Sequence, residues 1–242
     1  MALPFEQVID DSELSLDRLT ADVSVFQRMK GHRFSSDDMV TAWVALQVCP
    51  NPTRVLDLGC GLGSVLLHLA WSAPHAELVG VELQDMSFDL AQRNILHNRL
   101  EDRVVVRHGD FREPAVAATL GDRFDLITGT PPYFPAGTAT EAEDDQRARA
   151  RIEHWGGIES YVTAAALLLA PDGWFVVCGD SDARGRLDQV AALSGFVVCG
   201  RYVVIPRAGR PPLFSVWALR RHDAWIDAGG RALTLRDSCL LY

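Results

Sequence analysis

Short apolar runs alternate with amphipathic segments along most of the chain. Runs rich in β-branched residues predict strands at residues 55–58, 78–82, 104–108, 124–128 and 174–178. Helical spacing of apolar positions predicts helices at 39–48, 65–71, 85–99 and 187–193, with another helix ending at 167–170. Strands that alternate with helices in this way predict an α/β fold with a mostly parallel sheet.

The two ends of the chain follow different patterns. Residues 196–205 and 214–219 both favour strands and have no helix between them, which predicts an antiparallel pair at the end of the sheet. Residues 12–19 favour a short helix, and residues 23–27 favour an extended backbone. A Ser-x-x-Asp start at Ser35 predicts the N-terminus of the helix at 39–48. Residues 222–242 carry no pattern that is informative about structure.

A glycine-rich turn follows the first strand of the predicted sheet. From Asp57 the chain reads Asp-Leu-Gly-Cys-Gly-Leu-Gly, so that Gly59, Gly61 and Gly63 alternate with other residues. Glycine lets a ligand approach the main chain closely and tolerates a positive φ. In the dinucleotide-binding fingerprint the third small residue would fall at position 64 instead. A turn that packs closely and binds nothing would look similar, so the turn alone does not identify a cofactor site.

Acidic residues end the next two predicted strands. Glu82 lies nineteen residues after Gly63 and is followed by Leu83; a carboxylate there can accept from two ribose hydroxyls. Asp110 can accept from an adenine amine, with Phe111 against the ring face. The three strand ends together favour a nucleoside cofactor, and a cleft lined by acids also suits a sulfonium cation.

The fourth strand leads into the sequence Thr-Pro-Pro-Tyr-Phe at residues 130–134. In open α/β sheets the carboxyl ends of the strands face the ligand crevice. Pro131 and Pro132 have no N–H group, so the carbonyls around Thr130 remain available as acceptors. Tyr133 offers a flat face on which a planar substrate such as an extruded base can stack.

These motifs, taken in order, resemble one family. QRMKGHRFSSDDM, DLGCGLGS, GVELQ, GDF and PPYF are similar to the motifs of the bacterial tRNA adenine-N6 methyltransferases that modify the adenosine beside the anticodon of valine tRNA. That family belongs to the N-P-P-Y group of class I S-adenosylmethionine (AdoMet)-dependent methyltransferases. The resemblance covers roughly residues 20 to 220. It implies AdoMet as cofactor and a Rossmann-like fold, with a mostly parallel seven-stranded sheet that ends in an antiparallel hairpin.

The resemblance also implies a role for each motif. The expected cofactor-binding residues are Asp57, Gly59, Gly61, Gly63, Glu82, Leu83, Asp110 and Phe111, and the expected catalytic residues are Thr130, Pro131, Pro132 and Tyr133. The expected substrate contacts are Arg33, Phe34, Tyr133 and Phe134. Residues 1–50 would form an extension packing on the cofactor cleft, residues 51–221 the methyltransferase domain, and residues 222–242 a tail.

One residue departs from the family motif. Where the family has Asn or Asp to accept from the target amine, this chain has Thr130, whose shorter side chain can accept one hydrogen bond. The net charge of −9 also weakens the expectation of an RNA substrate. Three interpretations therefore stay open: methylation of adenine in tRNA, methylation of a protein side chain or small metabolite, and a cofactor-binding partner protein without transferase activity.

Composition bears on compartment and partners. The five cysteines show no metal-ligand spacing, so no metal is expected. We expect them to be reduced, in a cytoplasmic protein. The longest apolar run is too short to cross a bilayer, so no membrane partner is expected. The basic residues Arg28, Lys30, His32 and Arg33 either contact phosphates or form a solvated loop. Residues 135–151 favour a mobile flap over the substrate.

Overall fold

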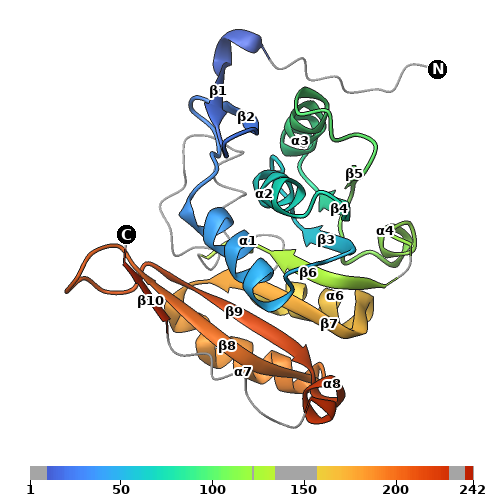
Figure 1. Cartoon of the computed structure of the whole chain (residues 1–242), viewed down its shortest axis with the longest axis vertical. Coiled ribbons are helices and arrows are strands. Elements are labelled where there is room, and N and C mark those ends of the chain that lie inside the picture. The colour runs from blue at the N-terminus through green and yellow to red at the C-terminus, as the bar shows by residue number, and fades with distance from the viewer. Residues whose placement is uncertain (1–9, 122, 134–156, 229–237, 242) are drawn as a thin grey trace.

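The main element of the structure, a computed structural model, is an eight-stranded sheet with the order β10-β8-β9-β7-β6-β3-β4-β5 (Figure 1). The structure describes residues 10–121, 123–133, 157–228 and 238–241. The strands of this sheet are β3 (Arg54–Leu58), β4 (Glu77–Glu82), β5 (Val104–His108), β6 (Phe124–Gly129), β7 (Leu169–Gly179), β8 (Phe196–Ile205), β9 (Phe214–Arg221) and β10 (Ser238–Leu241).

Most neighbouring strands of the sheet run parallel. The pairs β3·β4, β3·β6, β4·β5, β6·β7 and β8·β10 are parallel, and β9 pairs antiparallel with both β7 and β8. The predicted Rossmann-like fold and its antiparallel hairpin are therefore confirmed. The sequence of residues 222–242 was uninformative about structure, and α8 (His222–Asp227) and the eighth strand β10 lie there. The sequence pattern missed β10 because four residues are too few to show a period.

Helices cover both faces of the sheet. They are α1 (Ser36–Val48), α2 (Ser64–Ser72), α3 (Asp85–His97), α4 (Pro114–Ala117), α6 (Ile158–Leu168) and α7 (Arg184–Leu193), with short 3₁₀ turns η1 (Asp11–Glu13) and η2 (Ser181–Ala183). Buried residues of α1, α2 and α3 share one core cluster, and those of α6 and α7 share another. Successive residues of β3, Val55 and Leu56, enter opposite clusters because side chains alternate across a strand.

The N-terminal segment differs from the prediction of a helix at 12–19. Residues 14–18 form β1 (Leu14–Arg18), which pairs antiparallel with β2 (Ser24–Arg28). Pairing with β2 satisfies the backbone groups of β1, and this tertiary contact overrides local helical preference. The predicted start of α1 is confirmed, since the Ser35 N–H donates to Asp38 Oδ2 at 3.1 Å.

Helix α3 holds the β1–β2 hairpin through two asparagine side chains. Asn94 Oδ1 accepts from Phe26 N at 2.6 Å, and its amide group donates to the Phe26 carbonyl at 3.1 Å. Asn98 makes the same pair of bonds with the backbone of Ser24, at 3.0 and 2.7 Å. The side-chain amides therefore take the place of a neighbouring strand along β2, and they fix the chain that leads into residues 29–35.

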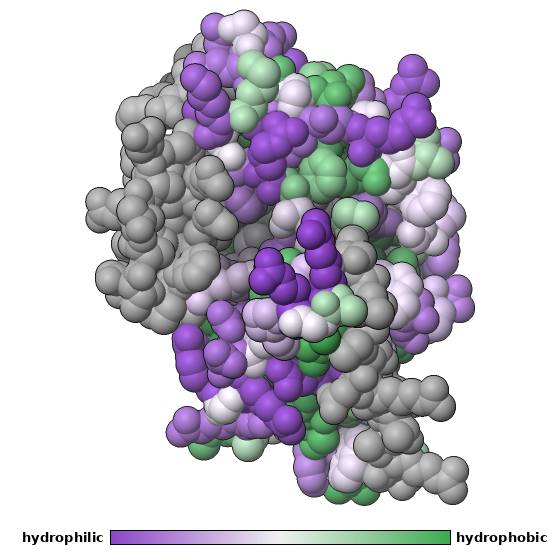
Figure 2. Space-filling model, turned by 90° about the vertical axis from the view of Figure 1, so that its left-hand side faces the viewer, coloured by the Kyte–Doolittle hydropathy of each residue, from purple (hydrophilic) through white to green (hydrophobic). Residues whose placement is uncertain are grey.

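The described residues on the face drawn in Figure 2 are mainly polar. Figure 2 shows a predominantly hydrophilic face on which hydrophobic residues form small, separate areas. Exposed large side chains such as Trp43, Trp71 and Leu193 belong to different helices. Within the described part of the chain, no helix has both the length and the apolar character needed to cross a membrane.

Candidate active site

A cavity of about 630 Å³ lies where the parallel strands β3, β4, β5 and β6 end. Its volume is in the range of small-molecule sites, and its place at the carboxyl ends of the strands is where α/β sheets bind ligands. Residues 29–38, ahead of and within the first turn of α1, form another part of its wall. The cavity therefore brings together segments that are far apart in the chain.

Most of the predicted site residues line this cavity. They are Arg33, Phe34, Gly59, Gly61, Glu82, Leu83, Asp110, Phe111, Thr130, Pro131, Pro132 and Tyr133. Asp57 and Gly63 are not in the lining. Phe134 and the flap predicted at 135–151 lie outside the described residues.

The glycine turn between β3 and α2 has a left-handed backbone. Gly59 and Gly61 have φ values of +63° and +56°, which residues other than glycine adopt at a cost in free energy. A Cβ atom on Gly61 would meet no atom within 4 Å, so this residue leaves open space beside the main chain. A Cβ atom on Gly59 would instead collide with the hydroxyl of Tyr161. The turn thus presents a bare backbone to the cavity at Gly61 and packs tightly at Gly59.

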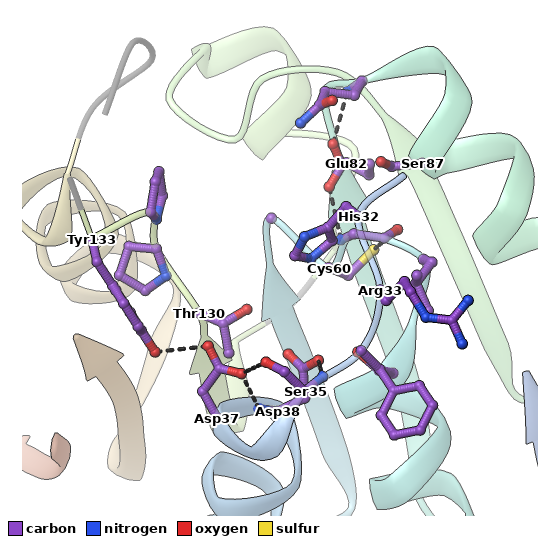
Figure 3. A pocket seen from close by; sticks show the side chains of 18 of the residues that line it. His32, Arg33, Ser35, Asp37, Asp38, Cys60, Glu82, Ser87, Thr130 and Tyr133 are labelled. Atoms are coloured by element: carbon purple, nitrogen blue, oxygen red, sulfur yellow. Dashed lines mark hydrogen bonds between the residues drawn. The ribbon is translucent and has the colours of Figure 1, made fainter. Parts of the chain in front are cut away.

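Glu82 ties the end of β4 to the glycine turn. Its Oε2 accepts from Gly61 N at 2.8 Å, and its Oε1 accepts from Gln84 N at 2.7 Å (Figure 3). The side chain is buried, and burial raises the pKa of its carboxyl group. A carboxylate has about four lone-pair sites, so Glu82 keeps capacity for a ligand hydroxyl beside these backbone bonds.

Asp57 lies behind the wall of the cavity. Its Oδ1 accepts from the Thr128 hydroxyl at 2.8 Å, and its Oδ2 is buried without a hydrogen-bond partner. Burial raises the pKa of this carboxyl group to about 7. An unpaired buried oxygen next to the glycine turn favours a positively charged ligand nearby. Direct contact between Asp57 and a cofactor stays a prediction.

The third strand end contains an ion pair that the sequence motif did not indicate. Arg112 Nε donates to Asp110 Oδ1 and Oδ2 at 2.8 and 3.0 Å, and this contact holds the pKa of Asp110 below its ordinary value. The adjacent Phe111 ring meets Tyr161 edge-on, with 4.8 Å between ring centroids. Both Arg112 and Tyr161 line the cavity. Tyr161 had no signal in the sequence, because it lies 50 residues after Phe111 of the GDF motif.

The loop after β6 is bonded to the start of α1. The Tyr133 hydroxyl donates to Asp37 Oδ2 at 2.8 Å and lies 3.0 Å from Cys178 Sγ (Figure 3). Burial is the main cause that raises the pKa of the Tyr133 phenol. Asp37 and the buried Asp38 both line the cavity, and burial together with Asp37 raises the pKa of Asp38. The sequence pattern indicated only a helix start at these acids, and the structure shows that they also line the cavity.

Arg33 and Phe34 line the cavity while they also hold the N-terminal hairpin. Arg33 Nη2 lies 3.0 Å from Asp17 Oδ2, and Arg33 Nη1 donates to the Ser15 hydroxyl at 3.0 Å. The Phe34 N–H donates to Gln27 Oε1 at 3.1 Å. Their role as substrate contacts stays a prediction.

Comparison with known proteins agrees with this geometry. Residues 34–151 match the family model described as Methyltransferase small domain. The chain is 34% identical over 193 residues to a tRNA1(Val) (adenine(37)-N6)-methyltransferase of Porphyromonas gingivalis, covering 78% of this chain and 74% of the relative. It is 38% identical over 149 residues to a release factor glutamine methyltransferase of Geobacter sulfurreducens, covering 58% of this chain and 50% of the relative.

Solved structures show the same fold at low sequence identity. P. horikoshii TYW2 in complex with MeSAdo is 15% identical, has a TM-score of 0.59, and is matched over 86% of this chain and 71% of that chain. A cavity bounded by a glycine turn, Glu82 and several carboxylates fits a cationic nucleoside such as AdoMet. The chain belongs to the family of the tRNA1(Val) adenine-N6 methyltransferases, within the AdoMet-dependent class I methyltransferases.

Proposed function

We propose that this enzyme methylates the exocyclic amine of an adenine in tRNA, with AdoMet as the methyl donor. One observation carries the proposal: the loop from Thr130 to Tyr133 and the cofactor motifs at Gly61 and Glu82 line the same cavity. A donor and an acceptor bound there share one cavity. The name of the P. gingivalis relative, which specifies adenine 37 of tRNA1(Val), supports this choice of substrate.

The cofactor end of the cavity supplies acceptors and a bare backbone. Glu82 would accept from the ribose hydroxyls, since its bonds to backbone N–H groups do not use all four lone-pair sites of the carboxylate. Phe111 would lie against the adenine ring beside Tyr161, and Asp110 would accept from its amine. Gly61 leaves room for the ligand against the main chain. When bound, AdoMet supplies an electrophilic methyl group on a positively charged sulfur.

The acceptor end positions the amine. Pro131 and Pro132 carry no N–H group, so this stretch of the loop offers carbonyls without competing donors. Tyr133 holds the loop against α1 through its bond to Asp37. Orientation of the two reactants in one site is enough for large rate gains, and no covalent enzyme intermediate is needed.

Contact with RNA phosphates would come from the loop that precedes α1. Lys30, His32 and Arg33 line the cavity on this side. The net charge of −9 means that such contacts act locally against an acidic background. Binding of tRNA should therefore weaken as salt concentration rises, because phosphate contacts release counterions.

The test is transfer of labelled methyl from AdoMet to tRNA by the purified protein, followed by digestion to nucleosides. Label in N6-methyladenosine is the expected result, and Glu82→Ala should abolish it by weakening cofactor binding. Label in other nucleosides, or none in RNA, would contradict the proposal.

A second candidate is methylation of a glutamine amide in a protein. The G. sulfurreducens relative, named a release factor glutamine methyltransferase, supports this candidate. Thr130 and the acidic net charge also suit a substrate other than RNA. Label in the protein fraction of the same assay would favour it. AdoMet binding without transfer to any fraction would favour a non-catalytic partner protein.

A further inference from the structure

We propose that Asp37 provides the side-chain hydrogen-bond acceptor for the target amine, a role that Thr130 fills poorly. This inference rests on the proposed function. Asp37 and Thr130 both line the cavity. Figure 3 shows Asp37, Thr130 and Tyr133 gathered in one part of the pocket, away from Glu82. The carboxylate therefore lies at the acceptor end of the site.

The chemistry of the substrate asks for two acceptors. The lone pair of an exocyclic or amide NH₂ group is delocalised, and hydrogen bonds from both N–H groups help to localise it on nitrogen. A backbone carbonyl of the Thr130–Pro131 segment can accept one of these bonds. The hydroxyl of Thr130 is a short, β-branched and neutral acceptor for the other. A carboxylate has no proton to offer and makes hydrogen bonds about twice as strong.

Asp37 is held in a defined orientation. Its Oδ2 accepts from the Tyr133 hydroxyl at 2.8 Å, and its Oδ1 accepts from the Ser35 hydroxyl and from Asp38 N, the latter at 3.2 Å. Because the single Tyr133 proton goes to Asp37, the thiol of Cys178 donates to the Tyr133 oxygen. These contacts fill about three of the four lone-pair sites of the Asp37 carboxylate and leave one for a substrate N–H.

The neighbouring acidic side chains make hydrogen bonds to other parts of the structure. Asp38 is buried and caps α1 through Ser35 N. Asp57 lies behind the wall, and Glu82 is bonded to the glycine turn. Asp180 lines the cavity, but its Oδ1 accepts from Asp182 N at 2.8 Å and caps η2. Asp37 is the one of these that is bonded directly to the loop containing Thr130.

In the transfer step the amine nitrogen forms a bond to the methyl carbon with its lone pair. The S–CH₃ bond breaks and its electron pair stays on sulfur, which becomes a neutral thioether. The methylated nitrogen then loses one proton, to the Asp37 carboxylate or to water. Asp37 thus orients the amine before the reaction and stabilises the positive charge that develops on nitrogen.

The test compares Asp37→Ala, Thr130→Asn and the double variant with the unmodified enzyme, in single-turnover transfer at saturating AdoMet and substrate. Asp37→Ala should slow transfer by about 10²–10³-fold while the dissociation constant of AdoMet changes little. Asp37→Asn, which keeps a neutral acceptor oxygen, should lose less. The double variant should transfer methyl at least tenfold faster than Asp37→Ala, because the amide oxygen of Asn at position 130 accepts the hydrogen bond.

The matched control is Asp223→Ala, which removes a fully solvated carboxylate from the first turn of α8 and should transfer at the unmodified rate. Unfolding curves show whether each variant folds, and Asp37→Asn covers the case in which Asp37→Ala does not. A variant that binds AdoMet at least tenfold more weakly but transfers normally at saturation would assign Asp37 to the cofactor and overturn the inference. Failure of Thr130→Asn to rescue Asp37→Ala would also overturn it.

The acceptor that the unmodified enzyme methylates tests the proposed function separately from the role of Asp37. Transfer to a glutamine amide instead of adenine would overturn the proposed substrate, while the same set of variants would still decide the role of Asp37, because an amide NH₂ has the same delocalised lone pair. Transfer to a hydroxyl or thiol would overturn both.

Discussion

Thr128 of β6 lies directly beside Asp57 of β3, and its hydroxyl donates to Asp57 Oδ1 at 2.8 Å. Both side chains are buried, with Thr128 fully enclosed. The other carboxylate oxygen of Asp57, Oδ2, is buried and has no hydrogen-bond partner among the described residues. Thr128 therefore compensates part of the cost of burying an acid next to the glycine turn.

Replacing Thr128 by valine tests this relationship. The change keeps the branched shape but removes the donor, so we expect the free energy of unfolding to fall by about 1–3 kcal/mol. Urea denaturation measures the loss. Thr163→Val on the exposed face of α6 is the control and should change stability by less than about 0.5 kcal/mol. Equal effects at the two positions would show that the buried bond contributes nothing.

The stability of the protein should fall as the pH rises from about 4 to about 8. Burial raises the pKa of Asp57 to about 7 and also raises the pKa values of Asp38 and Glu82. The folded state therefore binds protons more tightly than the unfolded chain does. This contribution is fully present below the ordinary pKa of a carboxyl group, near 4, and is lost as the pH rises through the raised values.

Urea denaturation at pH 5 and pH 8 checks this expectation, and the difference should amount to a few kcal/mol. Asp57→Asn should reduce the difference, because the amide does not titrate. Carboxylates with lowered pKa values, such as Asp17 and Asp110, act in the window below pH 4 and leave this comparison unaffected. The same pH dependence in Asp57→Asn as in the unmodified protein would rule out Asp57 as a source.

Gly59 and Gly61 should respond differently to alanine. Both have a positive φ, which costs alanine about 1–2 kcal/mol at either position. A Cβ atom at Gly59 also collides with Tyr161, whereas at Gly61 it meets no atom within 4 Å. We expect Gly59→Ala to lower the free energy of unfolding by a further 1–3 kcal/mol or so.

Tyr161→Phe provides the matching second change, because it removes the hydroxyl that the new Cβ would meet. In that background Gly59→Ala should cost less than in the unmodified protein, and the cycle of four proteins measures the coupling. Additive effects would mean that Tyr161 does not constrain the turn. Gly61→Ala, in contrast, should weaken AdoMet binding more than it affects stability.

Asn94 should anchor the N-terminal hairpin. Besides its two bonds to Phe26, its amide group donates to the Leu62 carbonyl at 2.9 Å, in a fully buried position. Asn94→Ala leaves those backbone groups unpaired, and we expect a loss of about 2–5 kcal/mol. Amide hydrogen exchange at residues 24–28 should speed up. Gln92→Ala, on the exposed side of α3, is the control and should leave both measurements near the unmodified values.

Elements with a strong local pattern could be predicted from the sequence. The strand ending at Leu58 and the Ser35 helix start follow from periodicity and capping, which depend on neighbouring residues. The helix expected at 12–19 was wrong, since β1 exists only because β2 pairs with it. Tyr161 and Arg112 were missed at the site because their contacts depend on how the strands and helices are arranged.

The sequence by itself determined the class of fold and the kind of cofactor. The glycine turn at Gly59 and Gly61 and the apolar strand that ends at Glu82 are local features, so they can be predicted from neighbouring residues alone. Only the tertiary structure decided which distant residues line the cavity together. The bond between Asp37 and Tyr133 joins residues 96 positions apart, and packing of α1 against the sheet brings them together. No local pattern encodes such a contact, because it forms only when distant apolar faces are buried against one another.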